Sequence, residues 1–325
     1  MQENTKKLLE FHEFLSNHKD NEISKIKTKA KLKNPWFTPE GIDFALDSWV
    51  RALNKKEVSK WLSRYKTTSN VRIVGLIPAG NIPLVGLHDL LCILVSGNKA
   101  KIKLSSKDEE LMKASISCLD NLFPNQIEIV ESLKEIDAII ATGSDTSFKY
   151  FDSYFGHLPH IFRKNRNSVA VLTGEETKEQ LQELGKDIFT YFGLGCRNVT
   201  HLIVPKEYKF DRFFESIVPF GDIIHHNKYN NNYSYNRTMY LMNKVPFLDN
   251  NFLMLNESKT LYSSIGVLHY HQSDSEEQTQ KYLNDLEENI QCVVGKDYVS
   301  FGQSQNPKLT DYADNVDTMK FLEFH

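Results

Sequence analysis

The residues from 191 to 205 read Tyr-Phe-Gly-Leu-Gly-Cys-Arg-Asn-Val-Thr-His-Leu-Ile-Val-Pro and join a predicted helix to a predicted strand. The helix is predicted over residues 177–192, where apolar side chains recur at spacings of three and four: Leu181, Leu184, Ile188 and Phe192. The glycines on either side of Leu194 allow the backbone to turn and expose the thiol of Cys196. A thiol at such a turn is a candidate nucleophile, because thioester chemistry needs an accessible thiolate. A buried, structural Cys196 is the competing interpretation, since free cysteines are among the most buried residues.

Composition narrows the class of protein. The chain has 325 residues, enough for two domains of roughly 100–200 residues each. It is 40% hydrophobic and 25% charged with a formal net charge of −3, which gives no electrostatic case for nucleic acid or an anionic membrane. The four cysteines lie far apart and predict no metal site. The longest apolar run, residues 82–95, is interrupted by His88 and Asp89 and is too short to span a bilayer. With no signal peptide at the start, we expect a cytoplasmic protein.

From residue 70 onward, predicted strands alternate with predicted helices. The strands are expected at 71–77, 99–104, 127–130, 138–141 and 168–172. This alternation predicts an α/β fold with a mostly parallel sheet covered on both faces. Ligands of such sheets bind at the carboxyl ends of strands, which is where the loops 78–83, 104–106 and 142–144 lie.

The two ends of the chain are less regular. Residues 1–70 predict amphipathic helices, one of them capped by Thr38 with Pro39 in its first turn. The Asn- and Tyr-rich segment from His225 to Arg237 is interpreted as a surface loop, and its histidine pair lacks further ligands at metal-binding spacing. The tail from residue 301 onward either packs back on the chain or contacts a partner.

Four motifs occur in an order that resembles the aldehyde dehydrogenase superfamily. They are Pro78-Ala79-Gly80-Asn81-Ile82-Pro83, the segment from Gly97-Asn98 to Ser105-Ser106, Ala141-Thr142-Gly143-Ser144, and Cys196. The sequence of residues 78–86, Pro-Ala-Gly-Asn-Ile-Pro-Leu-Val-Gly, is most similar to the acyl-CoA reductase branch, of which LuxC-like fatty acid reductases are members. The resemblance is good over residues 70–205 and loose elsewhere.

The resemblance implies a fold and a set of catalytic roles. It implies a Rossmann-type cofactor domain at 71–175 with a helical part at 1–70 packed on it, an α/β catalytic domain at 176–300, and a tail at 301–325. Cys196 would be the nucleophile, and the Asn81 amide with the Cys196 N–H would form the oxyanion hole. Without that resemblance, Asn81 is interpreted as stabilising a turn between two prolines.

The resemblance also implies where a nicotinamide cofactor binds. No Gly-x-Gly-x-x-Gly follows the first strand. Instead, Lys103 with Ser105 and Ser106 would border the adenosine ribose, and Thr142, Gly143 and Ser144 the pyrophosphate near a helix start. Viewed singly, Lys103 is interpreted as solvated and Ser144 as a helix cap. NAD-preferring relatives often carry an acid at the position of Ser106, so a serine beside Lys103 and Lys107 favours NADPH and leaves NADH as an alternative.

Two segments depart from the superfamily pattern. Residues 162–168 replace Glu-Leu-Gly-Gly-Lys and contain no carboxylate, so the general base for hydrolysis is missing. Ser263-Ser264-Ile265-Gly266 replaces Glu-x-Phe-Gly, whose glutamate binds the nicotinamide ribose. The basic side chains of Arg163, Lys164 and Arg166 either meet coenzyme A phosphates or form a solvated loop.

The hypothesis is therefore reduction of an acyl thioester, of the fatty acyl-CoA class, to the aldehyde by NADPH, with coenzyme A as the leaving group. One alternative is another reductase of the superfamily, acting on a semialdehyde or an acyl phosphate. A second is a catalytically degenerate, partner-binding subunit, which the two lost glutamates suggest. The expected partners are small molecules, and a homo-oligomer is left open.

Overall fold

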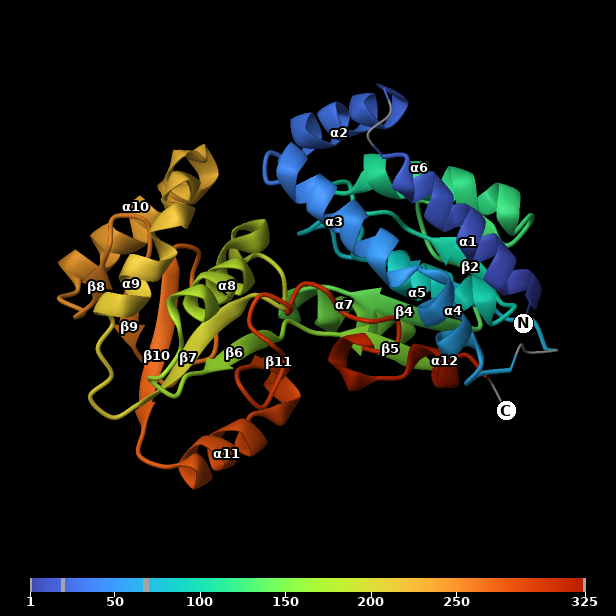
Figure 1. Cartoon of the computed structure of the whole chain (residues 1–325). Helices are drawn as coiled ribbons and strands as arrows, with labels where there is room; N and C mark the ends of the chain where they lie inside the picture. Colours follow the sequence, from blue (N-terminus) through green and yellow to red (C-terminus); the bar gives the residue numbers. More distant parts are fainter. Residues whose placement is uncertain (1, 19–20, 67–69, 324–325) are drawn as a thin grey trace. The chain divides into compact units, whose positions relative to one another are not determined.

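A computed structural model describes residues 2–18, 21–66 and 70–323 of the chain. The chain divides into two compact units, Met1–Asn165 with Asn306–His325 and Arg166–Gln305 (Figure 1). The division falls earlier than the domain boundary expected after residue 175. The chain also returns to the first unit at its end.

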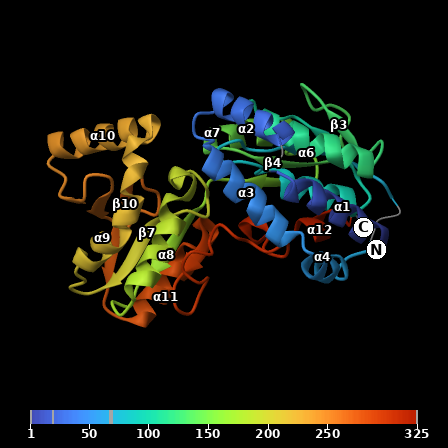
Figure 2. The same cartoon turned by 45° about the horizontal axis from the view of Figure 1, so that its top comes forward.

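Four helices begin the first unit: α1 Gln2–Ser16, α2 Asn21–Lys33, α3 Pro39–Ala52 and α4 Lys55–Leu62. Helices α1 and α2 both pack against α3, and α1 also packs against α4 (Figure 2). The predicted cap of α3 is confirmed, because the Thr38 hydroxyl accepts a hydrogen bond from the Gly41 N–H at 3.1 Å.

A parallel sheet of five strands forms the middle of the first unit: β1 Ile73–Ile77, β2 Lys99–Ile102, β3 Ile127–Ile129, β4 Ala138–Thr142 and β5 His160–Arg163. The strand order is β3-β2-β1-β4-β5. The chain moves outward from β1 in one direction and then returns to its other side with β4. The carboxyl ends of β1 and β4 therefore form the topological switch point at which open α/β sheets bind ligands.

Helix α5, Leu87–Val95, is the centre of this unit. Each of its residues except His88 is buried, because it packs between the sheet and the N-terminal helices. Two longer helices follow it in sequence, α6 Glu109–Leu122 and α7 Asp145–Phe155. Phe148 and Phe151 of α7 pack against Phe162 of β5.

A buried ion pair joins α5 to β5. Arg163 Nη2 lies 2.7 Å from Asp89 Oδ1, and the two side chains are 4% and 9% exposed. The same guanidinium donates to Thr318 Oγ1 at 2.9 Å and to the Ala313 carbonyl at 2.6 Å. The expectation that Arg163 meets coenzyme A phosphates or lies in a solvated loop is therefore wrong, since Arg163 ends a strand whose inner face points toward α5.

The C-terminal tail packs back on its own chain. It contains the short elements η4 Ala313–Asn315 and α12 Thr318–Phe321, and Met319 and Leu322 are buried in the core of the first unit. Trp61 Nε1 donates to the Tyr312 hydroxyl at 2.7 Å. Of the two sequence interpretations of the tail, the structure selects packing on the chain itself.

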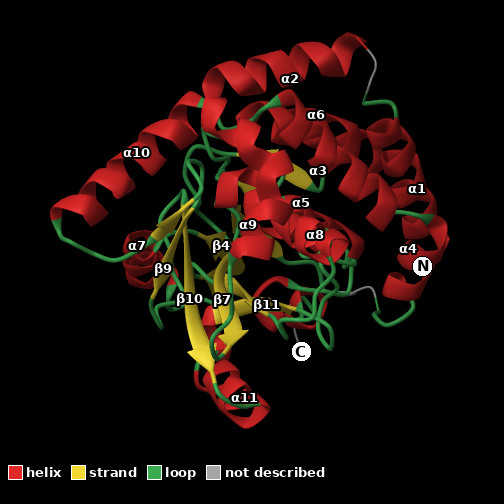
Figure 3. Ribbon diagram, turned by 60° about the vertical axis from the view of Figure 1, so that its left-hand side comes forward, coloured by secondary structure: helices red, strands yellow, loops and turns green. Residues whose placement is uncertain are grey.

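The second unit is built on a six-stranded sheet: β6 Asn167–Val171, β7 Val199–Pro205, β8 Leu248–Asp249, β9 Met254–Glu257, β10 Val267–Ser273 and β11 Ile290–Val294. The order is β11-β6-β7-β10-β9-β8, and β8 alone of these pairs antiparallel. Figure 3 shows β7, β10 and β9 side by side. The strand predicted at residues 168–172 was expected in the same sheet as the four predicted strands before it. It corresponds to β6 and belongs to the second sheet.

Helices cover both faces of this sheet: α8 Lys178–Phe189, η1 Thr190–Gly193, α9 Asp211–Ile217, η2 Val218–His225, α10 Asn227–Met242, α11 Glu276–Asp285 and η3 Glu287–Asn289. Helices α8 and α9 share one apolar core with β7 and β10. Leu283 of α11 packs on the opposite face with Val169 and Ile203.

The prediction of a surface loop from His225 to Arg237 is wrong, because most of this segment forms helix α10. The ring of His226 caps that helix by accepting from the Tyr229 N–H at 3.4 Å. Within the described part of the chain, no group of three or more metal-ligating side chains is found, and no helix has the length and apolarity needed to cross a membrane.

Replacing Arg163 by alanine would leave the Asp89 carboxylate buried without its guanidinium. We expect the free energy of unfolding of the first unit to fall by about 3–5 kcal/mol. Tryptophan fluorescence in urea reports on this unit, because all three tryptophans (Trp36, Trp49 and Trp61) belong to it.

The matched control is Arg72→Ala, which removes a half-exposed ion pair to Asp137 at 3.8 Å. Such surface pairs contribute at most about 1 kcal/mol. Equal losses in the two variants would contradict a structural role for the buried pair.

Candidate functional site

Two of the loops predicted to carry the site are in contact in the first unit. A Cβ atom added at Gly80 would lie 2.4 Å from Ser105 Oγ, so this close approach requires glycine. Nearby, the buried Asn34 amide donates to the carbonyls of Gly80 and Lys107, both at 3.4 Å. The structure thus brings the Asn81 loop against the loop that follows β2.

The Asn81 loop is fixed at its far end by a buried carboxyl group. Asn81 itself is exposed. Three residues later, Leu84 has a left-handed φ of 60°, and its N–H donates to Asp108 Oδ2 at 2.6 Å. Burial raises the pKa of Asp108 well above its usual range, and the Leu84 hydrogen bond only partly opposes this. Asp108 Oδ1 has no hydrogen-bond partner among the described residues.

The six residues expected to bind a cofactor lie at the carboxyl-terminal ends of strands β2 and β4 in the first sheet. Lys103 and Ser106 are exposed after β2, and Ser105 is half-buried. Thr142 ends β4, and Ser144 caps α7 by accepting from the Ser147 N–H at 3.3 Å. The alternative interpretation of Ser144 as a helix cap is therefore confirmed, and its role beside a pyrophosphate stays a prediction.

This edge has the chemistry that a dinucleotide needs. Helix α7 begins after Ser144, next to the switch point between β1 and β4, and helix N-termini favour phosphate groups. Gly143 leaves no room for a side chain there, since a Cβ would lie 2.7 Å from Ser147 Cβ. Lys103 and Lys107 supply positive charge on the β2 side. The residues present therefore fit a nicotinamide dinucleotide.

Cys196 lies in the second unit, at the tip of a closed turn. The Asn198 N–H donates to the Gly195 carbonyl at 3.0 Å, and Asn198 Oδ1 accepts from the Gly195 N–H at 2.8 Å. Cys196 lies in the turn between Gly195 and Asn198 and is exposed. The interpretation of Cys196 as a buried structural cysteine is therefore wrong. Its pairing with Asn81, which belongs to the other unit, stays a prediction.

The backbone that leads to this turn is left-handed. Helix α8 ends at Phe189 and does not continue to Phe192 as expected. Tyr191, Phe192 and Gly193 have φ values of 55°, 60° and 77°. For a residue with a side chain this conformation costs roughly 1–2 kcal/mol. The Phe192 ring is held against His226, with ring centroids 4.3 Å apart.

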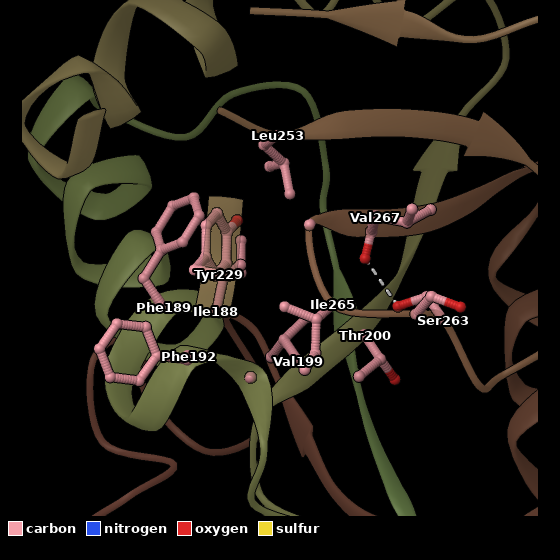
Figure 4. Close-up of a pocket in the computed structure, with 13 residues that line it drawn as sticks. Ile188, Phe189, Phe192, Val199, Thr200, Tyr229, Leu253, Ser263, Ile265 and Val267 are labelled. Carbon is pink, nitrogen blue, oxygen red and sulfur yellow. Dashed lines mark hydrogen bonds between the residues drawn. The ribbon is translucent and has the colours of Figure 1, made fainter. Parts of the chain in front are cut away.

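An apolar pocket of about 30 Å³ lies beside this left-handed run (Figure 4). Its lining includes Phe192 and Gly193 on one side and residues 263–267 on the other. The segment that replaces the superfamily's Glu-x-Phe-Gly is thereby placed close to the Cys196 turn. The Ser263 hydroxyl donates to the Val267 carbonyl at 2.8 Å. The volume holds one or two water molecules, which is too small for a long acyl chain.

Two buried polar side chains, Ser168 and Asp187, bind backbone near the Cys196 turn, and Ser168 binds the turn itself. Ser168 Oγ donates to the Cys196 carbonyl at 3.0 Å and lies 3.1 Å from Cys292 Sγ. The Asp187 carboxylate accepts from the N–H groups of Gly302 and Ser304 at 2.6 and 2.9 Å. Burial raises the pKa of the Cys292 thiol and of Asp187. Sequence patterns did not reveal Ser168, Asp187 or Asn198, because their roles depend on contacts that no motif encodes.

A buried histidine pair lies elsewhere in the second unit. His201 Nε2 is 2.6 Å from His271 Nδ1, and the Thr260 carbonyl contacts the Nδ1 atoms of His201 and His269 at 3.1 and 2.9 Å. A carbonyl only accepts, so His201 carries its proton on Nδ1 and accepts at Nε2 from His271. Burial lowers the pKa of His201 to about 3 and that of His271 to about 4.

This pair makes the second unit sensitive to acid. Both rings are neutral in the fold, whereas unfolded histidines bind protons below about pH 6.5. The stabilisation is therefore complete above pH 6.5 and is lost as the pH falls toward 4, by on the order of 3 kcal/mol for each ring. Hydrogen exchange of β7 and β10 peptides at pH 7 and pH 4.5 measures this loss.

The variant His271→Asn keeps an N–H donor for His201 but does not titrate, so its protection should fall less on acidification. The exposed His225→Asn serves as the control in the same unit. An identical pH dependence in all three proteins would exclude the histidine pair as the cause.

Comparisons with known proteins support the fold. No family model and no curated protein matches the sequence. Among solved structures, an NAD-dependent benzaldehyde dehydrogenase from Corynebacterium glutamicum is similar with a TM-score of 0.67 and 13% identity, covering 91% of this chain and 76% of that one. A putative aldehyde dehydrogenase from Burkholderia cenocepacia gives a TM-score of 0.67 and 11% identity, covering 93% and 75%.

A third similar structure is a Mycobacterium tuberculosis aldehyde dehydrogenase complexed with NAD+, with a TM-score of 0.62, 13% identity and coverage of 90% and 72%. These neighbours are members of the aldehyde dehydrogenase superfamily. The predicted fold is thus confirmed: the chain has the aldehyde dehydrogenase fold, with a Rossmann-type parallel sheet and a second, mixed sheet.

Proposed function

We propose that the chain is an oxidoreductase of the aldehyde dehydrogenase superfamily, from its acyl-CoA reductase branch. It reduces an acyl thioester of the fatty acyl-CoA class to the aldehyde with NADPH. The observation that carries this proposal is the exposed Cys196 thiol at the tip of a closed turn. An accessible thiol on rigid backbone is what nucleophilic catalysis requires.

Cys196 acts first. Its thiolate attacks the carbonyl carbon of the substrate, the bond between that carbon and the coenzyme A sulfur breaks, and coenzyme A leaves as a thiol after taking a proton. The acyl group then remains on Cys196 as a thioester. The Asn81 amide and the Cys196 N–H donate to the oxyanion, and such donors contribute about 2.7–4 kcal/mol each.

Residues at the carboxyl-terminal edge of the first sheet would hold the cofactor. Lys103, Ser105 and Ser106 would border the adenosine ribose, and Thr142, Gly143 and Ser144 the pyrophosphate. When bound, the nicotinamide would supply the hydride that releases the acyl group as an aldehyde, and the Cys196 sulfur would leave as a thiolate that takes up a proton. The NAD+ complex of the Mycobacterium tuberculosis neighbour supports a nicotinamide cofactor.

The missing base favours reduction over hydrolysis. Residues 162–168 form the end of β5 and the start of β6 and contain no carboxylate. Asp187, which lies on the helix preceding the turn, is buried and already accepts two backbone hydrogen bonds. It is therefore not placed to activate water against an acyl-enzyme.

A second candidate is a superfamily reductase of a semialdehyde or an acyl phosphate. The small pocket beside the Cys196 turn does not distinguish the two candidates, because about 30 Å³ holds only one or two water molecules. The degenerate, partner-binding alternative predicts no turnover of any of these substrates. A substrate series from acetyl to long-chain acyl-CoA, with an acyl phosphate and a semialdehyde, separates the three.

The nucleophile is tested by aldehyde formation from acyl-CoA with NADPH. We expect Cys196→Ala to abolish it, because no thioester can form on the enzyme. The control is Cys118→Ala, which removes a half-buried thiol on α6 of the first unit. Equal activity in wild type and Cys196→Ala would end the assignment.

The coenzyme preference is tested with Ser106→Glu. The added carboxylate would repel a 2′-phosphate, so we expect the KM for NADPH to rise at least about tenfold with little change for NADH. Ser117→Glu places the same charge on the exposed face of α6 and controls for net charge. A parallel change for both coenzymes would contradict a role for Ser106 near the 2′ position.

A further inference from the structure

Asn198 is buried completely, although it is a polar residue in the turn that presents an exposed thiol. Every polar atom of its side chain is used. Oδ1 accepts from the Gly195 N–H, and Nδ2 donates to the carbonyls of Thr190, Asp187 and Ile188 at 2.7, 3.0 and 3.3 Å. The carbonyls of Asp187 and Ile188 lie in the last turn of α8, and Thr190 is its C-cap residue. A helix leaves such last carbonyls without intrahelical partners.

One side chain therefore joins three pieces of backbone. It caps the C-terminus of α8, spans the left-handed run at Tyr191 and Phe192, and closes the Cys196 turn. The run on its own is unfavourable, because left-handed backbone at residues with side chains is strained. Strained backbone persists only where surrounding contacts determine it, and the donor bond to Thr190 is such a contact.

We propose that Asn198 is a positioning residue for the Cys196 thiol. By tying Gly195 to the end of α8, it fixes the direction in which the side chain of Cys196 leaves the backbone. Ser168 adds a second tether by donating to the Cys196 carbonyl. The inference rests on the proposed function of Cys196 as nucleophile. Attack on a carbonyl carbon requires a fixed approach, and a displacement of about 1 Å can cost a factor of about 10² in rate.

The chain contains a matched residue that separates positioning from stability. Asn256 on β9 is also a buried asparagine of the second unit, and its Nδ2 donates to the Pro246 carbonyl at 2.9 Å. Asn256→Ala and Asn198→Ala remove the same side-chain atoms, and Asn256 donates to one backbone carbonyl where Asn198 donates to three. Only Asn198 is bonded to the Cys196 turn.

The experiment compares wild type, Asn198→Ala, Asn256→Ala and Cys196→Ala as full chains at a temperature where each is folded by circular dichroism. Turnover of the acyl-CoA that wild type reduces gives kcat and KM. Alkylation of Cys196 by iodoacetamide, followed by peptide mass spectrometry, reports whether the thiol is still accessible, and Cys196→Ala gives the background. A small neutral reagent tolerates many approach directions, unlike a bound substrate.

We expect Asn198→Ala to lower kcat by about 10²-fold while the KM values for acyl-CoA and NADPH and the alkylation rate stay close to wild type. Asn256→Ala should retain the wild-type kcat. Equal kcat in the two asparagine variants overturns the positioning role while leaving Cys196 as nucleophile. Loss of alkylation in Asn198→Ala overturns it as well, because the role would then be exposure of the thiol. Wild-type protein that reduces no acyl thioester overturns the proposed function and the positioning role together.

Discussion

The buried ion pair of Asp89 and Arg163 is the constraint on which the first unit depends. Two charges are tolerated in a protein core only when their attraction and additional hydrogen bonds offset the loss of water. Here the extra bonds come from the C-terminal tail, through Thr318 and the Ala313 carbonyl. Strand β5, helix α5 and the tail therefore have to assemble together. Because α5 directly follows the Asn81 loop, the same pair also anchors the backbone that presents Asn81.

Each unit holds its predicted reactive loop in the same physical way. A left-handed residue with a side chain lies close to the loop, and a buried polar group from elsewhere stabilises the backbone there. In the first unit Asp108 accepts from Leu84. In the second, Asn198 joins Gly195 to the end of α8 beyond Tyr191 and Phe192. Such strain persists because the neighbouring contacts leave the chain no relaxed alternative, and it keeps the loop from sampling many conformations.

Sequence patterns predicted the elements whose stability is local. The apolar runs of β1 and β4 and the caps at Thr38 and Ser144 depend on neighbouring residues, and these were predicted. Strand β5 was missed because it is short and contains His160 and Arg163. Arg163 is buried only because Asp89, 74 residues away, accepts its charge. Helix α10 was missed because its Asn- and Tyr-rich sequence has no amphipathic period. Its position depends on the His226 cap and on packing of Tyr229 and Tyr233, which are buried.

The order of the motifs predicted which loops gather at the edge of the first sheet, but not what holds them there. Neighbours at 11–13% identity share this scaffold, because an apolar pattern and a strand order can be kept by many sequences. The chemistry depends on far fewer atoms, and the fold alone does not supply them. Under the proposed function, those atoms are an exposed sulfur at Cys196 and a carboxyl at Asp187 that already accepts hydrogen bonds from two backbone N–H groups. A nucleophile at Cys196 would form an acyl-enzyme, and the Asp187 carboxylate would not be placed to direct water against it. On this proposal, a few side chains decide between reduction and hydrolysis, on a scaffold that would serve either.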